Sequence, residues 1–212
     1  MKHGEIPRDS LSGVVGLILA AGASTRMRPL GNKLTQLIDD ERRLVSVPID
    51  AMHEAGIDLV FVVLGSDAES LRAFLRDRPL SYVFNPEWEM GLGSSIAAGV
   101  RGILELHRPK AIMVCLGDLP GLRAEWLALL VEHFDAANTS DCICVPTHDG
   151  RFGHPVLFGS AYFEALAKLA GDHGGRSILE AHAEQIREVE ITSDAILRDI
   201  DTPEDLDAWR RS

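Results

Sequence analysis

Cysteine is scarce in this sequence and shows no recognisable pattern. The three cysteines, Cys115, Cys142 and Cys144, all lie within apolar stretches. They form no C-x-x-C pair, and an odd number provides no disulfide framework. We therefore expect buried, reduced thiols that behave as small apolar residues, as is typical of proteins in the cytoplasm.

Long apolar runs are also missing. Residues 1–13 lack the apolar core of a signal peptide, and no stretch approaches the roughly 20 apolar residues that cross a bilayer. Pro7 and Gly13 stand in this polar segment, which indicates a flexible N-terminal tail. The sequence thus predicts a cytoplasmic protein without a membrane partner.

Basic residues are outnumbered. There are 21 Lys and Arg against 32 Asp and Glu, which gives a formal net charge of -11. Nucleic-acid backbones favour clustered Lys and Arg, so this balance argues against a nucleic-acid partner. One stretch, LILAAGASTRMR, nevertheless places Arg26 and Arg28 just after an apolar run. A single basic loop in an acidic protein favours a small anionic ligand.

Several familiar catalytic signatures are absent. The loop around Gly22 is not followed by the Lys-Ser or Lys-Thr of a P-loop, and it is not a G-x-G-x-x-G sequence. A dinucleotide-dependent dehydrogenase therefore loses its main support. No Ser-His-Asp or Cys-His set is evident either, so the sequence gives no sign of a side-chain nucleophile.

What the sequence does contain is an alternation of apolar runs and amphipathic segments. The runs are continuous and rich in Val and Ile, as in parallel strands covered on both faces; they are residues 14–20, 58–65, 80–85, 110–118 and 141–146. Helical patterns occupy residues 43–56, 67–77, 94–107 and 122–137. We expect an α/β fold with a Rossmann-like, doubly wound, mostly parallel sheet, and a single domain over residues 14–212.

Two segments interrupt this rhythm. Residues 146–175 are rich in glycine, which predicts long functional loops around one further strand, PVLFG. The C-terminal AILRDIDTPEDLDAWRR predicts a short strand, a turn and a last helix. Thr202 is expected to cap that helix, with Pro203 at its first position and Asp205 in a variant capping box.

The candidate site lies where the strands end, because ligands of open α/β sheets bind beyond the carboxyl ends of strands. Small residues around Gly22 allow backbone N–H groups to approach phosphate oxygens, and Arg26 and Lys33 add positive charge. The alternative is a tight turn with solvated arginines.

Carboxylates at two further points suit a divalent cation. Asp118 follows an apolar strand in CLGDLPG, and either binds Mg²⁺ or caps the next helix. In RDIDTPED, Asp199 and Asp201 alternate along an extended segment, so only one is expected to face a site shared with Asp118. We assign that role to Asp201; the alternative is that Asp201 only shapes the turn.

Five motifs, in this order, resemble the MobA-like nucleotidyltransferase family, and its molybdenum cofactor cytidylyltransferase branch most closely. They are LAAGASTRM, FNPEWEMGLGSSIAAGV, CLGDLPG, GRFGHPVLF and DIDTPEDL. The resemblance implies a three-layer α/β/α nucleotidyltransferase domain. It also implies transfer of a nucleoside monophosphate from a triphosphate to a phosphorylated acceptor, with release of pyrophosphate.

The resemblance further implies roles for individual residues. Arg26 and Lys33 would contact the triphosphate, and Asp118 and Asp201 would hold Mg²⁺. Relatives that use GTP carry LAGG where this chain has LAAG, so Ala21 favours CTP. The implied acceptor is molybdopterin, and the implied partner is a molybdenum hydroxylase apoenzyme.

The remaining implied site residues form two groups. Those for the nucleotide are Leu19, Ala20, Ala21, Gly22, Gly91, Ser94 and Ser95. His154 and Arg176 are the implied acceptor-binding residues, whereas Asn85 and Trp88 are expected to organise a loop. A purely structural role stays open for His154, and a helix cap for Ser94. Arg28 stands where relatives have glycine, and Gly31 is expected to restore the turn.

Three alternatives remain at this point. The first is a guanylyltransferase of the same fold, and the second is a nucleotidyltransferase that acts on a sugar phosphate or an alcohol phosphate. The third is a non-catalytic module that binds and delivers the molybdenum cofactor. Two candidate metal-binding carboxylates favour an enzyme over a delivery module.

Overall fold

A computed structural model describes residues 13–211, apart from the side chains of Arg28 and Pro29. The tail expected over residues 1–13 therefore lies almost wholly outside the described residues. The side chain of Arg28 lies outside them as well. The backbone of Arg28 and Pro29 belongs to the 3-10 helix η2 (Thr25–Leu30).

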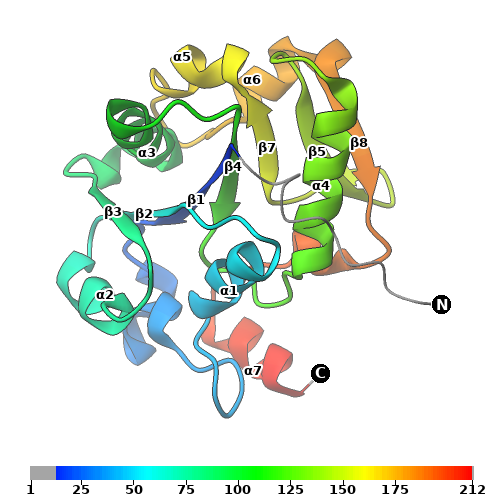
Figure 1. Ribbon diagram of the computed structural model, residues 1–212. Helices are drawn as coiled ribbons and strands as arrows, with labels where there is room; N and C mark the ends of the chain where they lie inside the picture. Colours follow the sequence, from blue (N-terminus) through cyan, green and yellow to red (C-terminus); the bar gives the residue numbers. More distant parts are fainter. Residues whose placement is uncertain (1–12, 212) are drawn as a thin grey trace.

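The described strands form one eight-stranded sheet (Figure 1), in the order β3-β2-β1-β4-β7-β5-β6 with β8 also paired to β5. Their bounds are β1 Val14–Ala20, β2 Val60–Leu64, β3 Ser81–Phe84, β4 Ala111–Leu116, β5 Ile143–His148, β6 Arg151–Phe152, β7 Val156–Gly159 and β8 Ile186–Glu190. β7 runs antiparallel to β4 and β5, and β6 antiparallel to β5. The other pairs are parallel, which confirms a mostly parallel sheet.

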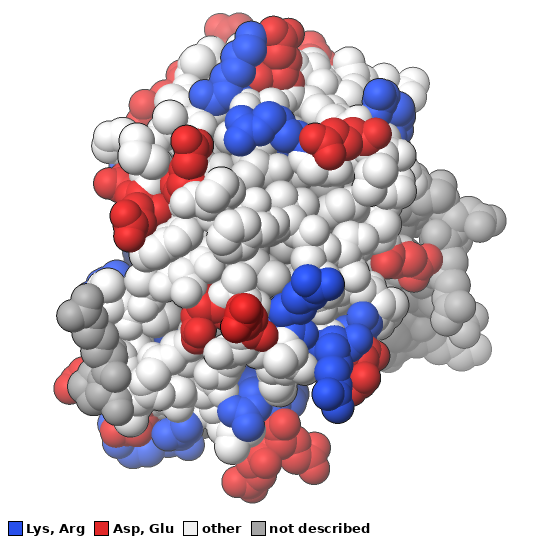
Figure 2. Space-filling view, turned by 90° about the vertical axis from the view of Figure 1, so that its left-hand side faces the viewer, with Lys and Arg blue, Asp and Glu red and all other residues white. Residues whose placement is uncertain are grey.

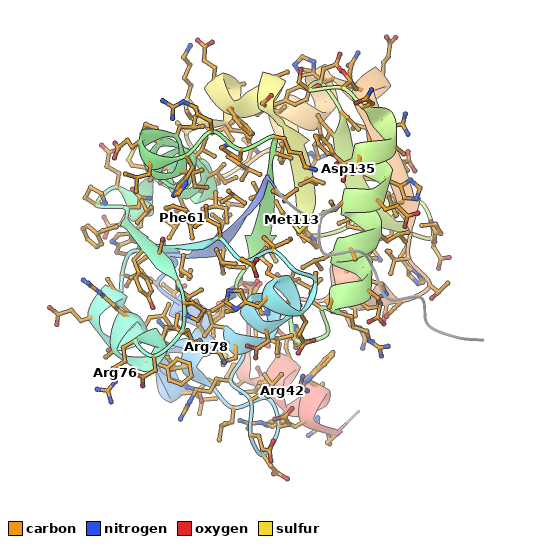
Figure 3. The ribbon with its side chains drawn as sticks, in the orientation of Figure 1. Arg42, Phe61, Arg76, Arg78, Met113 and Asp135 are labelled. Carbon is orange, nitrogen blue, oxygen red and sulfur yellow. The ribbon has the colours of Figure 1, made fainter. Side chains whose placement is uncertain are left out.

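Helices cover both faces of this sheet. They are α1 (Ser46–Glu54), α2 (Ala68–Leu75), α3 (Leu92–Leu106), α4 (Ala124–Ala137), α5 (Phe163–Leu166), α6 (Arg176–Ala181) and α7 (Pro203–Arg211). Alternate residues of each central strand enter opposite cores: Met113 belongs to the core formed with α1, α2 and α4, and Phe61 to the core formed with α3, α5 and α6 (Figure 3). This confirms the predicted three-layer arrangement.

The expectation of a strand in the C-terminal segment was wrong. Asp194–Leu197 forms a 3-10 helix, η7, whose start is held by the Ser193 hydroxyl oxygen accepting the Ala195 N–H. β8 and the short β6 were missed instead. In β8 only Val189 is buried, so a largely exposed strand left no continuous apolar run in the sequence.

The last helix begins as predicted. The Thr202 hydroxyl oxygen accepts the Asp205 N–H at 3.2 Å, and the Asp205 carboxylate accepts the Thr202 N–H at 2.8 Å. Pro203 is the first residue of α7. The same Asp205 carboxylate accepts the Asp201 N–H at 3.2 Å, so the capping box also fixes the backbone of Asp201.

Parallel pairing of β1 with β4 decides where the site lies. Leu19 is in register with Leu116, and the Gly117 N–H donates to the Leu19 carbonyl at 3.0 Å, so both strands end at the same edge of the sheet. Gly65, after β2, closes this edge: a Cβ there would lie 2.5 Å from the Ala21 carbonyl oxygen. Only glycine allows this approach.

Two further observations concern the helices and the surface. No helix among residues 13–211 is long and apolar enough to cross a membrane. On the face shown in Figure 2, Lys and Arg side chains are interspersed with Asp and Glu. That face carries no continuous basic surface.

Candidate active site

The loop after β1 is held by its own polar residues, and they position Lys33. The Asn32 side chain accepts the Leu34 N–H at 2.9 Å and so caps the short 3-10 helix η3 (Lys33–Thr35). The Ser24 hydroxyl accepts the Lys33 N–H at 3.2 Å. The part of the loop that carries Lys33 is therefore ordered by its own hydrogen bonds.

Lys33 joins two carboxylates that are distant in sequence. Its Nζ lies 2.6 Å from Asp118 Oδ2 and 2.6 Å from Asp201 Oδ1, and the Lys33 and Asp118 side chains are 14% and 15% exposed. Arg26 Nη2 reaches the other oxygen of Asp201 at 2.7 Å. Arg26, Lys33, Asp118 and Asp201 thus form one cluster, which we call the charged cluster.

The charges of this cluster alter the acid–base behaviour of Lys33. Burial by itself would lower the pKa of Lys33, but the facing Asp118 and Asp201 carboxylates outweigh it, and the pKa lies above its ordinary value. Lys33 is therefore an ammonium ion at neutral pH and has a positive charge to offer to phosphate oxygens.

Asp118 has the features of a metal ligand. It follows β4, and its carbonyl accepts the Ile200 N–H at 3.1 Å, which ties the two acidic segments together. Its Oδ1 is buried and has no hydrogen-bond partner within residues 13–211. A buried unpaired carboxylate oxygen is costly unless a ligand satisfies it, and oxygen donors suit a hard divalent cation.

The position of Asp199 differs from the prediction. We expected Asp199 and Asp201 to point to opposite faces, yet single carboxylate oxygens of Asp118, Asp199 and Asp201 all lie within 4.8 Å of one another. The segment from Arg198 to Asp201 is not a strand, so the strict alternation of a strand does not apply. Burial, together with Asp118 and Asp201, raises the pKa of Asp199.

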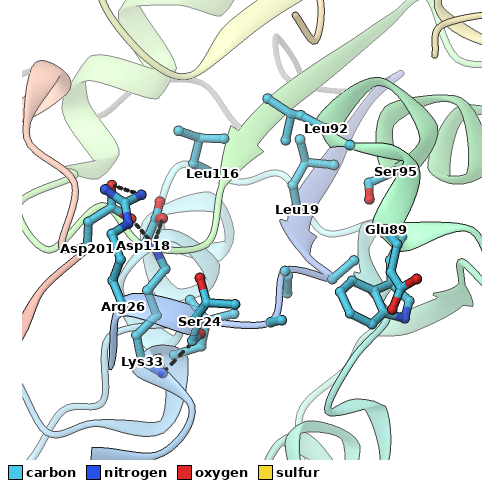
Figure 4. Close-up of a pocket in the computed structure, with 18 of the residues that line it drawn as sticks. Leu19, Ser24, Arg26, Lys33, Glu89, Leu92, Ser95, Leu116, Asp118 and Asp201 are labelled. Atoms are coloured by element: carbon cyan, nitrogen blue, oxygen red, sulfur yellow. Dashed lines mark hydrogen bonds and ion pairs between the residues drawn. The ribbon is translucent and has the colours of Figure 1, made fainter. Parts of the chain in front are cut away.

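The charged cluster forms one end of a cavity of about 510 Å³ (Figure 4). Most residues predicted to bind the nucleotide line it: Leu19, Ala20, Ala21, Gly22, Gly91 and Ser95. Figure 4 shows Glu89 and Ser95 on the side of the cavity opposite Lys33 and Asp118. The described residues that line the cavity do not include Ser94, His154 or Arg176.

Ser94 has a structural environment. α3 begins at Leu92, so Ser94 is not the cap that the sequence left open, and its hydroxyl contacts the carbonyls of Glu87 and Gly91 at 2.8 Å. The Asn85 amide donates to the hydroxyls of Ser94 and Ser95 at 2.9 and 3.2 Å. Asn85 therefore organises this loop, as predicted.

A family comparison accords with this geometry. Residues 16–186 match the MobA-like NTP transferase domain. The chain belongs to this family. It is therefore a nucleotidyltransferase by family, and the predicted resemblance is confirmed.

Two curated relatives cover nearly the whole of this nucleotidyltransferase. Nicotine blue oxidoreductase of Paenarthrobacter nicotinovorans is 30% identical over 91% of this chain and 94% of its own length. Purine catabolism protein PucB of Bacillus subtilis is 30% identical over 94% of this chain and 97% of its own.

Solved structures agree with the fold. Rv0371c of Mycobacterium tuberculosis superposes with a TM-score of 0.77 and 25% identity, over 94% of this chain and 98% of its own. A manganese complex of the same protein has a TM-score of 0.74 and 26% identity, over 95% of this chain and 100% of its own.

The two residues implied for the acceptor are not among those that line the cavity. Arg176 is exposed at the start of α6 and pairs with Glu180 at 2.8 Å. His154 Nδ1 is buried without a hydrogen-bond partner within the described residues. Burial lowers the pKa of His154 below its ordinary 6.5, against the opposing effect of Asp118. Acceptor binding by either residue stays a prediction.

A buried neutral histidine makes stability depend on pH. Because the pKa of His154 is lower in the folded state, the unfolded state binds more protons, and stability falls as the pH drops below 6.5. We expect His154→Phe to flatten the decline in free energy of unfolding between about pH 7 and pH 5. Urea titrations at several pH values measure this. Parallel pH profiles for both proteins would contradict it.

Several residues of the cavity were not predicted as ligand-binding, and among them Trp88, Glu89 and Asp172 carry aromatic or charged side chains. Trp88 was expected only to organise a loop. Asp172 lies in the glycine-rich GDHGGR, where the sequence drew attention to Arg176 instead. The signal for Asp172 was present in those glycines, because they allow a loop to approach another backbone closely.

Gly91 is the point of that approach. Its φ is +93°, and a Cβ would lie 2.2 Å from Oδ1 of Asp172 and 2.6 Å from the Gly171 carbonyl carbon. We expect Gly91→Ala to cost about 1–3 kcal/mol of stability and to displace this loop.

Displacement of the loop should also weaken nucleotide binding, which fluorescence titration measures. Gly150→Ala is the matched control, because Gly150 also has a positive φ of +71° but has open space for a Cβ. The interpretation fails if both variants bind nucleotide as the unmodified protein does.

Proposed function

We infer that the protein transfers CMP from CTP to the terminal phosphate of molybdopterin, or of a closely related phosphorylated acceptor, and releases pyrophosphate. The observation that carries this is the charged cluster at one end of a nucleotide-sized cavity. Together with the adjacent Asp199, this cluster brings two cations and three carboxylates from separate segments to one place, and a simple structural ion pair would not need so many.

The chemistry needs no nucleophilic side chain. An oxygen of the acceptor phosphate attacks the α-phosphorus of CTP. The bond from that phosphorus to the oxygen bridging the β-phosphate breaks, and pyrophosphate leaves with the electron pair. The acceptor phosphate is already ionised, so the work of the chain is to position the groups in line and to neutralise charge.

Arg26 and Lys33 fit the stabilisation of the departing pyrophosphate. Arg26 is exposed at 66% of its side chain, so it moves without disturbing the core. Lys33 sits deeper, and its ammonium has to leave the two carboxylates to reach a phosphate oxygen. The loop built by Asn32 and Ser24 holds its backbone during that movement.

The residues present suit a divalent cation, for which we propose Mg²⁺. Asp118 and Asp201 would hold it, with Asp199 close enough to contribute, and the unpaired Oδ1 of Asp118 supports this. When bound, the cation supplies Lewis-acid neutralisation of phosphate oxygens. The manganese found in Rv0371c supports a divalent metal in a related protein.

The choice of CTP and molybdopterin rests on the resemblance of LAAG and GRFGHPVLF to the cytidylyltransferase branch. Ala21 lines the cavity, where an added methyl group affects how a base fits. The molybdenum hydroxylase partner belongs to the same proposal, as does a single nucleotidyltransferase domain over residues 14–212.

A substrate panel tests the proposal. Pyrophosphate release is measured with CTP, GTP, ATP and UTP, each with molybdopterin, with a sugar phosphate and without acceptor. The expected result is release with CTP and molybdopterin together. Release with GTP or a sugar phosphate would replace the proposed substrates, and none with any pair would contradict nucleotidyl transfer. Because one relative is named an oxidoreductase, the panel includes oxidation of a reduced nicotinamide cofactor.

A further inference from the structure

Two acidic side chains line the cavity without a part in the phosphate chemistry. Glu89 belongs to the 3-10 helix η4 (Trp88–Met90), and Asp172 to the loop between α5 and α6. Within residues 13–211, neither carboxylate takes part in a hydrogen bond or an ion pair. Asp118 and Asp201, in the same cavity, are both paired with Lys33. Two unpaired acceptors in a ligand cavity are available to a ligand.

The position of Asp172 is fixed by its neighbours. The Gly93 N–H donates to the Gly171 carbonyl at 2.8 Å, which seats the loop on the first turn of α3. Gly91 lacks the Cβ that would collide with Asp172 Oδ1. α3 is 15 residues long, and its N-terminus favours a negative charge nearby. The carboxylate is therefore held at the cavity wall.

The two carboxylates stand at the end of the cavity that suits a nucleoside. Figure 4 shows Glu89 across the cavity from Lys33 and Asp118, where the phosphates belong. Phosphates are repelled by carboxylates, so this end suits the uncharged part of the nucleotide. Trp88 lines it and offers an aromatic surface on which a base stacks.

We propose that Asp172, assisted by Glu89, accepts hydrogen bonds from the exocyclic amino group of the base and so makes the site select cytosine over uracil. This rests on the proposed CMP transfer. An ionised carboxylate is an acceptor only. Uracil has a carbonyl oxygen in place of the amino group, so two acceptors would face each other and both would lose water without compensation.

The test measures binding, so it does not depend on turnover. Dissociation constants of CTP and UTP are measured by tryptophan fluorescence with Mn²⁺ and without acceptor. We expect the unmodified protein to bind CTP at least about tenfold more tightly than UTP. In Asp172→Asn this ratio should fall toward one, because a carboxamide also donates to the uracil oxygen. Glu89→Gln should reduce the ratio less.

Asp149→Asn is the matched control. Asp149 is exposed at 88% of its side chain, lies outside the cavity and has a φ of +50°, which asparagine also tolerates. The ratio should not change in this variant.

Two outcomes overturn the proposal directly. One is an unchanged CTP to UTP ratio in both Asp172→Asn and Glu89→Gln. The other is a variant that loses only the discrimination between CTP and dCTP, because this would place the carboxylate at the ribose.

If the unmodified protein prefers GTP to CTP, CMP transfer is contradicted. The GTP to ITP ratio then decides the role of Asp172, because inosine lacks the amino group: a fall in Asp172→Asn supports it, and no change overturns it.

Discussion

Asp118→Asn should reduce turnover by about 10²–10³-fold or more while the protein remains folded. The carboxamide keeps the shape of the side chain, but it removes one negative charge from the group of carboxylates that would hold the metal. It also replaces the charged partner of Lys33, at 2.6 Å, with a neutral one. Pyrophosphate release measures turnover, and circular dichroism with thermal unfolding shows whether the protein remains folded.

The control is Asp58→Asn. Asp58 is exposed just before β2, at the opposite edge of the sheet from the cavity, so this variant makes the same chemical change without touching the site. It should retain full activity. Activity close to that of the unmodified protein in Asp118→Asn would remove Asp118 from the metal site.

Lys33→Met should separate metal binding from nucleotide binding. The Lys33 ammonium stands between Asp118 and Asp201, where a cation would bind, and its departure from them costs free energy. Removal of the ammonium leaves two carboxylates that repel each other, and a bound cation would relieve this repulsion. Mn²⁺ should therefore bind about tenfold more tightly without nucleotide, while CTP binds more weakly for lack of a phosphate contact.

Electron paramagnetic resonance of free Mn²⁺ measures the affinity for the metal, and fluorescence titration measures the affinity for CTP. Lys168→Met is the control, because Lys168 pairs with Glu164 on the exposed surface. Unchanged Mn²⁺ affinity in Lys33→Met would show that the ammonium does not compete with the metal.

The sheet was predictable where its strands are buried on both faces. β1 and β4 consist almost wholly of buried apolar residues, so their runs stand out in the sequence and place the loop at Gly22 and Asp118 at one edge. β8 was not predictable in this way, because packing of one exposed strand against β5 leaves little apolar pattern.

The candidate site was also predictable only in part. Arg26, Asp118 and Asp201 were proposed because they follow a strand or precede a capped helix, and Lys33 because it lies close to Arg26 in the sequence. The bridge from Lys33 to Asp201 joins residues 168 positions apart, and only the fold reveals it. Asp199 was misjudged because strand geometry was applied to an irregular segment. For Asp172, the glycines beside it indicate a close approach of the loop, but the local sequence does not reveal that the loop approaches Gly91.

The fate of the α-phosphorus of CTP tests the central claim most directly. The protein is incubated with CTP labelled at that phosphorus, molybdopterin and Mg²⁺, and the products are separated. We expect the label to move into a product that contains the acceptor, in equal amount to the pyrophosphate released, and we expect Asp118→Asn to abolish this transfer. Label that remains in CTP, or that appears only as free CMP, would contradict it.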